Sequence, residues 1–124
     1  MEIWINPACS KCRTALSTLD TAGLTYTVRR YLDDPPTADE LDAVLTRLGL
    51  EPWDVARLGE TVAKELGLAD LPHERHRWLE VMAANPILIQ RPIITAEDGT
   101  TLVGRTPESV QQAIDAERSA PSPG

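Results

Sequence analysis

The chain has 124 residues, of which 42% are hydrophobic and 25% charged, enough for one domain with a single hydrophobic core. Its net charge of −7 argues against a general nucleic-acid binder, and no apolar run approaches the ~20 residues that a membrane span needs. The N-terminus has no basic region followed by a long apolar stretch, so we expect a cytoplasmic protein. We also expect a monomer that binds neither nucleic acid nor membranes.

The charge is unevenly distributed along the chain. Residues 1–31 contain four basic and two acidic side chains, a local net charge of +2, so the remainder carries −9. Ten of the twelve basic residues are arginines, whose planar guanidinium suits oxyanions better than an ammonium does. A small anionic substrate is therefore compatible with this acidic chain, although a surface ion pair is the alternative for any single arginine.

The N-terminal third predicts a strand, a helix and a second strand. Residues 2–5 are β-forming and end at the turn signal Asn6-Pro7. Apolar residues between 15 and 22 then recur at helical spacing, and Gly23 stands where a helix would end. Residues 25–32 are again rich in β-forming types.

The middle of the chain predicts helices. Thr37 and Glu40 form a capping box ahead of a helical apolar pattern that stops at Gly49. Two further helices are expected near 52–66 and 72–84.

The C-terminal third predicts a β-hairpin followed by a helix. Residues 87–90 lead into a strand at 91–95, and Asp98-Gly99 is the turn before its partner at 100–103. Thr106 and Pro107 are suited to the N-cap and first position of the last helix.

This order predicts an α/β protein with a thioredoxin-like fold, in which β-α-β and β-β-α segments share one mixed sheet. The helices at about 37–84 are expected to be an insertion into a single domain covering residues 1–116. Residues 117–124 have nothing to bury and are expected to form a disordered tail.

The only two cysteines, Cys9 and Cys12, form a C-x-x-C pair. A disulfide-rich scaffold would use more cysteines, and a four-cysteine zinc site is impossible within this chain. No bound metal is therefore expected. A redox or nucleophilic role remains, or else two inert thiols.

Cys9 lies where the first predicted helix begins. Unpaired backbone N–H groups and the positive end of the helix dipole would stabilise a thiolate there, and Lys11 and Arg13 add positive charge. The same N–H groups could hold a bound oxyanion. A nucleophile and an anion site are therefore expected to coincide.

Pro92 opens the predicted third strand. In thioredoxin-like folds the proline at this point commonly has a cis peptide bond and packs beside the redox cysteine. A trans proline at a strand start is the alternative.

Four ordered segments resemble the glutaredoxin-coupled arsenate reductase family, which includes the Spx-type regulators. They are NPACSKCR at 6–13, YL followed by PP within 31–36, PILIQRPI at 86–93 and GRTPE at 104–108. The resemblance covers residues 1–116, nearly the whole chain.

The resemblance implies that Cys9 attacks arsenate and forms a covalent thiol–arsenic adduct. Glutathione, as co-substrate, and glutaredoxin or a thioredoxin-type reductant would then release arsenite, with no bound cofactor. By their surroundings, Arg57, Arg91 and Arg105 correspond to the three family arginines that bind the oxyanion.

Two positions depart from the pattern of some arsenate-reducing members. Ile5 stands where those members have a histidine before Asn-Pro, and Cys12 stands where they often have serine. A thiol at Cys12 could attack a mixed disulfide on Cys9 and favour thiol–disulfide chemistry.

The leading hypothesis is therefore an arsenate reductase that uses Cys9, with Cys12 as a possible resolving thiol. A general glutathione-dependent thiol reductase and a Spx-type redox regulator that binds RNA polymerase are the alternatives. A fold that has lost turnover is the remaining possibility.

Overall fold

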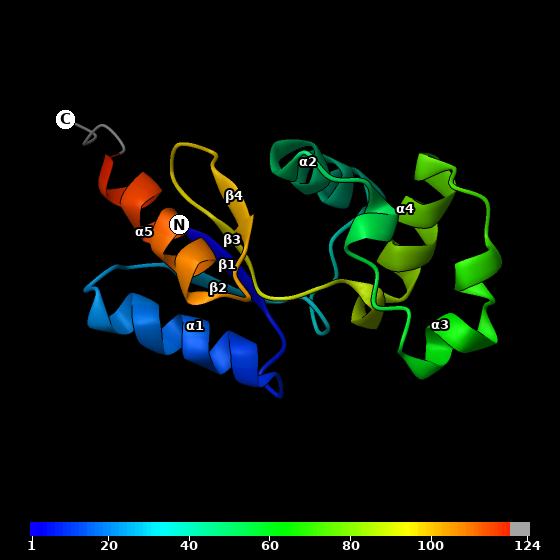
Figure 1. Ribbon diagram of the computed structural model, residues 1–124, viewed down its shortest axis with the longest axis horizontal. Coiled ribbons are helices and arrows are strands. Elements are labelled where there is room, and N and C mark those ends of the chain that lie inside the picture. The colour runs from blue at the N-terminus through cyan, green and yellow to red at the C-terminus, as the bar shows by residue number, and fades with distance from the viewer. Residues whose placement is uncertain (120–124) are drawn as a thin grey trace. The chain divides into compact units, whose positions relative to one another are not determined.

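The computed structural model describes residues 1–119, and the chain divides into two compact units. The first unit is formed by Met1–Tyr31 together with the chain from Arg91 onward, and the second by Leu32–Gln90 (Figure 1). The insertion expected at about 37–84 lies inside the second unit, and a single-domain organisation stays a prediction. In the described part of the chain, no helix is both long and apolar enough to cross a membrane.

A four-stranded mixed sheet in the order β2-β1-β3-β4 is the centre of the first unit. β1 pairs in parallel with β2 and antiparallel with β3, which pairs antiparallel with β4. The strands are β1 (Glu2–Ile5), β2 (Thr27–Arg30), β3 (Ile93–Thr95) and β4 (Thr101–Val103). The predicted α/β class, the thioredoxin-like arrangement and the hairpin turn at Gly99, with φ 89°, are confirmed.

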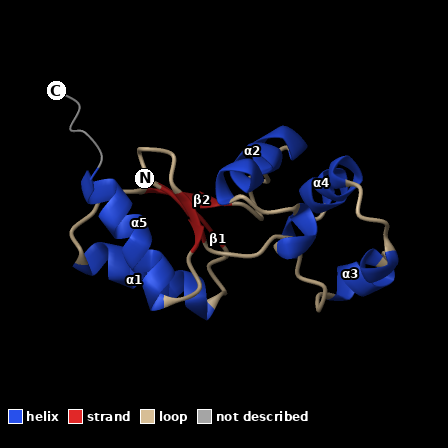
Figure 2. Ribbon diagram, turned by 45° about the horizontal axis from the view of Figure 1, so that its top comes forward, coloured by secondary structure: helices blue, strands red, loops and turns tan. Residues whose placement is uncertain are grey.

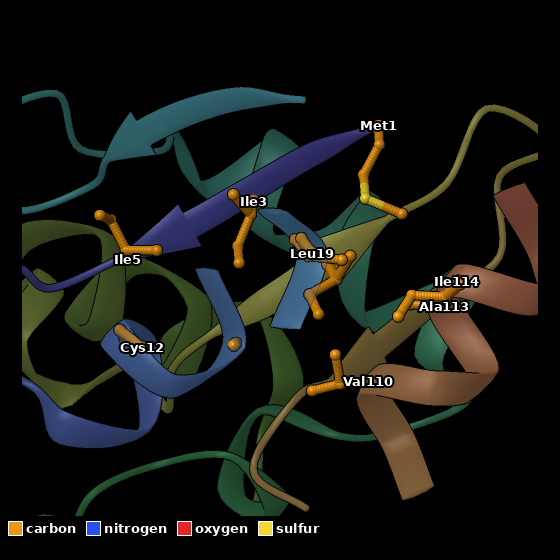
Figure 3. Close-up of a cluster of buried hydrophobic side chains, with 10 residues drawn as sticks. Met1, Ile3, Ile5, Cys12, Leu19, Val110, Ala113 and Ile114 are labelled. Atoms are coloured by element: carbon orange, nitrogen blue, oxygen red, sulfur yellow. The ribbon is translucent and has the colours of Figure 1, made fainter. Parts of the chain in front are cut away.

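Helices α1 (Ser10–Thr21) and α5 (Pro107–Ser119) pack side by side against this sheet (Figures 1 and 2). Their apolar faces meet side chains of β1 and β3 in one core, drawn in Figure 3. This core consists of Met1, Ile3, Ile5, Cys12, Ala15, Leu19, Ile94, Val110, Ala113 and Ile114. Burial of these side chains against α1 fixes the position of the helix N-terminus that carries Cys9.

The second unit is helical and contains α2 (Ala38–Leu48), α3 (Thr61–Glu65) and α4 (Arg75–Ala84). The capping box and the Gly49 stop predicted for α2 are confirmed, with Gly49 left-handed at φ 70°. Buried residues of α2 and α4 form the apolar interior: Leu41, Val44, Leu45, Trp78, Leu79 and Met82.

The single helix predicted near 52–66 is wrong. A short 3-10 helix at Pro52–Asp54 precedes irregular chain, and α3 begins only at Thr61. The backbone between these two helices pairs with the segment around residues 88–90. The Arg57 N–H donates to the Leu88 carbonyl at 2.8 Å, and the Gln90 N–H donates to the Val55 carbonyl at 2.9 Å. This long-range pairing overrides local helix propensity.

Two further boundaries differ from the sequence predictions. Pro86–Leu88 forms a short 3-10 helix. The third strand starts at Ile93, two residues later than the predicted start at 91. Residues 117–119, expected in the disordered tail, belong to α5, where Arg118 donates to the Ala22 carbonyl at 3.1 Å. The rest of the predicted tail, 120–124, lies outside the described residues.

Replacing Thr37 with alanine should lower the free energy of unfolding by about 1 kcal/mol. The Thr37 hydroxyl accepts the Glu40 N–H at 3.1 Å, and the Glu40 carboxylate accepts the Thr37 N–H at 3.1 Å. Urea denaturation measures the loss. Thr46→Ala, the same change in the interior of the same helix, is the matched control and should cost less. Equal losses from both variants would contradict the capping contribution.

Candidate active site

Cys9 is the residue immediately before α1, with extended backbone angles of φ −85° and ψ 123°. Its side chain is partly exposed. The sulfur is therefore placed at the helix N-terminus, where the helix dipole favours an anion. This is the position that the sequence predicted.

Asn6 shapes the loop between β1 and α1. Its main-chain carbonyl accepts the Cys9 N–H at 2.9 Å, and its side-chain Oδ1 accepts the Ala8 N–H at 3.0 Å. Its own N–H donates to Cys12 Sγ at 3.5 Å. Asn6 is buried and holds both ends of the C-x-x-C turn. The sequence indicated a turn at Asn6 but not this supporting role.

The pKa of Cys9 is lowered from 9.0 to about 6. Burial of the sulfur opposes ionisation, but the Cys12 N–H, the Arg91 side chain, the Cys12 thiol and the Lys11 N–H all hydrogen-bond to it. These donors stabilise the thiolate more than burial disfavours it. At pH 7 most Cys9 side chains are then ionised.

Cys12, unlike Cys9, has a raised pKa. Its side chain is fully buried in the core of the first unit (Figure 3), and burial together with the neighbouring Cys9 raises its pKa to about 11. Cys12 is therefore a neutral thiol at physiological pH. A protonated sulfur can donate a hydrogen bond to the Cys9 thiolate but is a poor nucleophile.

Arg91 provides the positive side chain beside Cys9. It is 7% exposed and directly precedes Pro92, and the Arg91–Pro92 peptide bond is cis, as expected for this position. Lys11 and Arg13 were expected from the sequence to supply local positive charge, and both of these side chains are exposed. Lys11 contacts Cys9 through its backbone N–H.

Arg105 is attached to the same loop, because its Nη1 donates to the Arg91 carbonyl at 2.8 Å. Gly104 permits this approach. Its N–H donates to the Pro92 carbonyl at 2.9 Å, and a Cβ there would lie 2.8 Å from the Ile94 Cδ1. Gly104 therefore supports the contact between the two loops. In the sequence it stood out only as the first residue of the GRTPE segment.

Arg57 belongs to the second unit. Its Nε pairs with Glu60 at 3.0 Å, and its Nη1 donates to Gln90 Oε1 at 2.7 Å. The structure thus brings Cys9, Cys12, Arg91, Pro92 and Arg105 together in the first unit, and the role predicted for Arg57 stays a prediction. Within residues 1–119, no three His, Cys, Asp or Glu side chains are grouped as metal ligands would be.

Comparison with known proteins places this site in a family. The model of the ArsC family matches residues 4–113, which include the C-x-x-C turn, Arg91 and Arg105. The chain belongs to the ArsC family. This confirms the resemblance noted in the sequence.

Alignments with known relatives span almost the whole length of this ArsC chain. It is 58% identical over 117 residues to an uncharacterized protein from Streptomyces viridochromogenes, covering 92% of this chain and 98% of that one. It is 36% identical over 115 residues to an arsenate reductase of Neisseria meningitidis, covering 92% and 97%. The solved arsenate reductase from Vibrio cholerae superposes with a TM-score of 0.80 at 33% identity, covering 94% and 98%.

The residue before Asn6-Pro7 is Ile5, which is 4% exposed and packs in the core (Figure 3). It places no titratable side chain at this point. The donors around Cys9 include Arg91 and the first-turn N–H groups instead.

Proposed function

We propose that this chain is an arsenate reductase in which the Cys9 thiolate is the nucleophile. One observation carries the proposal: a sulfur with a pKa of about 6 lies at a helix N-terminus beside the buried Arg91. The thiolate supplies the nucleophile at neutral pH. The N–H groups and Arg91 are donors suited to an oxyanion.

In the first step the Cys9 sulfur attacks arsenic(V). A sulfur–arsenic bond forms, an arsenic–oxygen bond breaks, and the departing oxygen takes up protons and leaves as water. Arg91 and Arg105 balance the charge of the remaining oxygens, with Lys11 and Arg13 adding positive potential nearby.

In the second step an external thiol, glutathione, attacks the Cys9 sulfur of the adduct. A sulfur–sulfur bond forms, and the electron pair of the sulfur–arsenic bond stays on arsenic, which leaves as arsenite, arsenic(III). A second thiol, from glutathione or glutaredoxin, then reduces the mixed disulfide on Cys9. Two thiols thus supply the two electrons and end as one disulfide.

Cys12 is the competing source of the resolving thiol. Its sulfur is fully buried and its pKa is about 11, so very little thiolate is available for attack. The external thiol is therefore favoured over Cys12. The role assigned to Cys12 is that of a hydrogen-bond donor to Cys9.

Cys12→Ser tests this assignment directly, since serine keeps a hydroxyl donor but has no redox-active sulfur. We expect arsenate-dependent NADPH oxidation, coupled through glutathione, glutaredoxin and glutathione reductase, to fall by less than about threefold. Cys12→Ala, the matched control without a donor, should raise the Cys9 pKa and reduce activity further. Loss of all activity in Cys12→Ser would establish Cys12 as the resolving thiol instead.

The same assay separates the alternative functions. Turnover of a small disulfide with no turnover of arsenate in any reductant system would replace arsenate reduction by general thiol reduction. Cys9→Ser is the blank in both measurements.

A further inference from the structure

Gln90 and Arg91 lie at one of the two points where the chain passes between the units. Gln90 is the last residue of the second unit, and Arg91 is the residue at which the chain returns to the first. The Arg91 side chain hydrogen-bonds to the Cys9 sulfur. Because one peptide bond joins Gln90 to Arg91, the position of Arg91 depends on what holds the chain on each side of that bond.

The first unit holds the chain that follows this bond. The Arg91 carbonyl accepts the Arg105 Nη1 at 2.8 Å, and the Pro92 carbonyl accepts the Gly104 N–H at 2.9 Å. Both contacts are made by carbonyl groups at or after Arg91. They fix the carbonyl side of this residue but not its amide side.

The second unit holds the chain that precedes the bond, by a short antiparallel pairing. Ala56 forms an isolated β-bridge with Ile89, and the Gln90 N–H donates to the Val55 carbonyl at 2.9 Å. Val55 and Ile89 are both buried. This pairing fixes the main chain as far as the Gln90 N–H.

The side chain of Gln90 adds a second contact within the second unit. Its Oε1 accepts the Nη1 of Arg57 at 2.7 Å, across 33 positions of the chain. The Arg57 Nε pairs with Glu60 at 3.0 Å, which fixes the orientation of the guanidinium. The contact between Gln90 and Arg57 is partly buried, so water competes with it less than at an exposed position.

We infer that Gln90 is a positioning residue for Arg91. Its contact with Arg57 fixes the main chain at the Gln90–Arg91 bond, so that the Arg91 guanidinium stays beside the Cys9 sulfur. Gln90 is uncharged and acts through Arg91. The inference rests on the proposed function, in which Arg91 stabilises the Cys9 thiolate.

A displaced Arg91 has a measurable consequence at Cys9. The charged or titratable side chains that hydrogen-bond to the Cys9 sulfur are those of Arg91 and Cys12, and Arg91 supplies the positive charge. A charge-assisted hydrogen bond weakens when its length and angle are no longer maintained. When Gln90 no longer holds the chain, the thiolate should therefore form at higher pH.

Gln90→Leu tests this role, because leucine has a similar size but no oxygen that could accept from Arg57. The substitution changes no charge, so a shift in the Cys9 titration reports a change around the sulfur. Followed by the ultraviolet absorbance of the thiolate, the titration should move to higher pH, by less than in a variant that lacks the Arg91 guanidinium. We expect kcat/KM for arsenate to fall by up to about tenfold, the factor that one hydrogen bond to a charged group can supply.

A double variant tests whether Gln90 acts through Arg57. Arg57→Ala removes a charge and can shift the Cys9 titration by itself, so it is compared with Arg57→Ala/Gln90→Leu. These two variants should titrate at the same pH, because the donor to the Gln90 oxygen is already gone. A further shift in the double variant would overturn the proposed route.

Two single variants complete the test. Gln112→Leu, the same change at an exposed position of α5, is the matched control and should titrate like the unmodified chain. Gln90→Ala removes the oxygen with a smaller side chain and should shift the titration in the same direction as Gln90→Leu. Unshifted titration in either Gln90 variant, with thermal unfolding showing an intact fold, would overturn the positioning role.

The two proposals fail differently. A shifted titration in Gln90→Leu, without arsenate turnover by the unmodified chain, would retain the positioning role and reject arsenate as substrate. Arsenate turnover by the unmodified chain, with an unshifted titration in Gln90→Leu, would reject the positioning role and retain the reductase.

Discussion

Replacing Cys9 with serine should abolish arsenate-dependent NADPH oxidation. The Cys9 pKa of about 6 keeps the sulfur ionised at neutral pH, whereas a serine hydroxyl in the same place stays protonated. Within residues 1–119, the groups that stabilise the thiolate are backbone N–H donors, a thiol and a cation, and none of these is a general base that could activate an alcohol. The coupled assay with glutathione, glutaredoxin and glutathione reductase measures the loss.

The fold of this variant should be intact. Cys9 occupies the N-cap position of α1, and serine is among the preferred residues there. Thermal unfolding should therefore occur at the same temperature as in the unmodified chain, or slightly higher. Measurable turnover in a well-folded Cys9→Ser variant would rule out Cys9 as the nucleophile.

Replacing Arg91 with alanine should have the second-largest effect. The guanidinium is buried and hydrogen-bonds to the Cys9 sulfur, so its removal takes away both an oxyanion donor and a cation that favours the thiolate. We expect kcat/KM for arsenate to fall by more than about tenfold, beyond the ~1 kcal/mol of an exposed ion pair. The pKa of Cys9 should rise in this variant.

The dependence of activity on pH shows in which direction Arg91 shifts the Cys9 pKa. In the unmodified chain, activity should rise with pH as the thiolate forms near pH 6 and should fall below that pH. In Arg91→Ala the rise should move to higher pH, because the thiolate has lost a positive partner. Ultraviolet absorbance of the thiolate, measured across the pH range, follows the same titration without substrate.

Two further variants control for structure and charge. Arg91→Lys keeps the charge but not the planar fork, so it should preserve most of the low Cys9 pKa while weakening arsenate binding. Arg77→Ala, at an exposed position of α4 in the second unit, should change neither quantity. An unchanged Cys9 titration in Arg91→Ala would exclude Arg91 from the site.

The resemblance to the arsenate reductase family and the location of Cys9 at a helix N-terminus were both available from the sequence. The Asn6-Pro7 turn, the C-x-x-C spacing and the helical pattern that follows are local signals, and a helix N-terminus has the same unpaired N–H groups in any fold. The capping box at Thr37 and the hairpin turn at Gly99 are local in the same sense. These features are correct because neighbouring residues alone determine them.

The surroundings of the two cysteines and of Arg91 were decided only by the tertiary structure. Cys12 looked like a resolving thiol by spacing, but packing among β1, β3 and α5 buries it and keeps it protonated. Arg91 is 82 positions from Cys9 along the chain, and the pairing of β3 with β1 places it beside the sulfur. Lys11 and Arg13 are closer in sequence, but their side chains are exposed on the helix surface. Burial and long-range strand pairing set these environments, and neither can be read from local spacing.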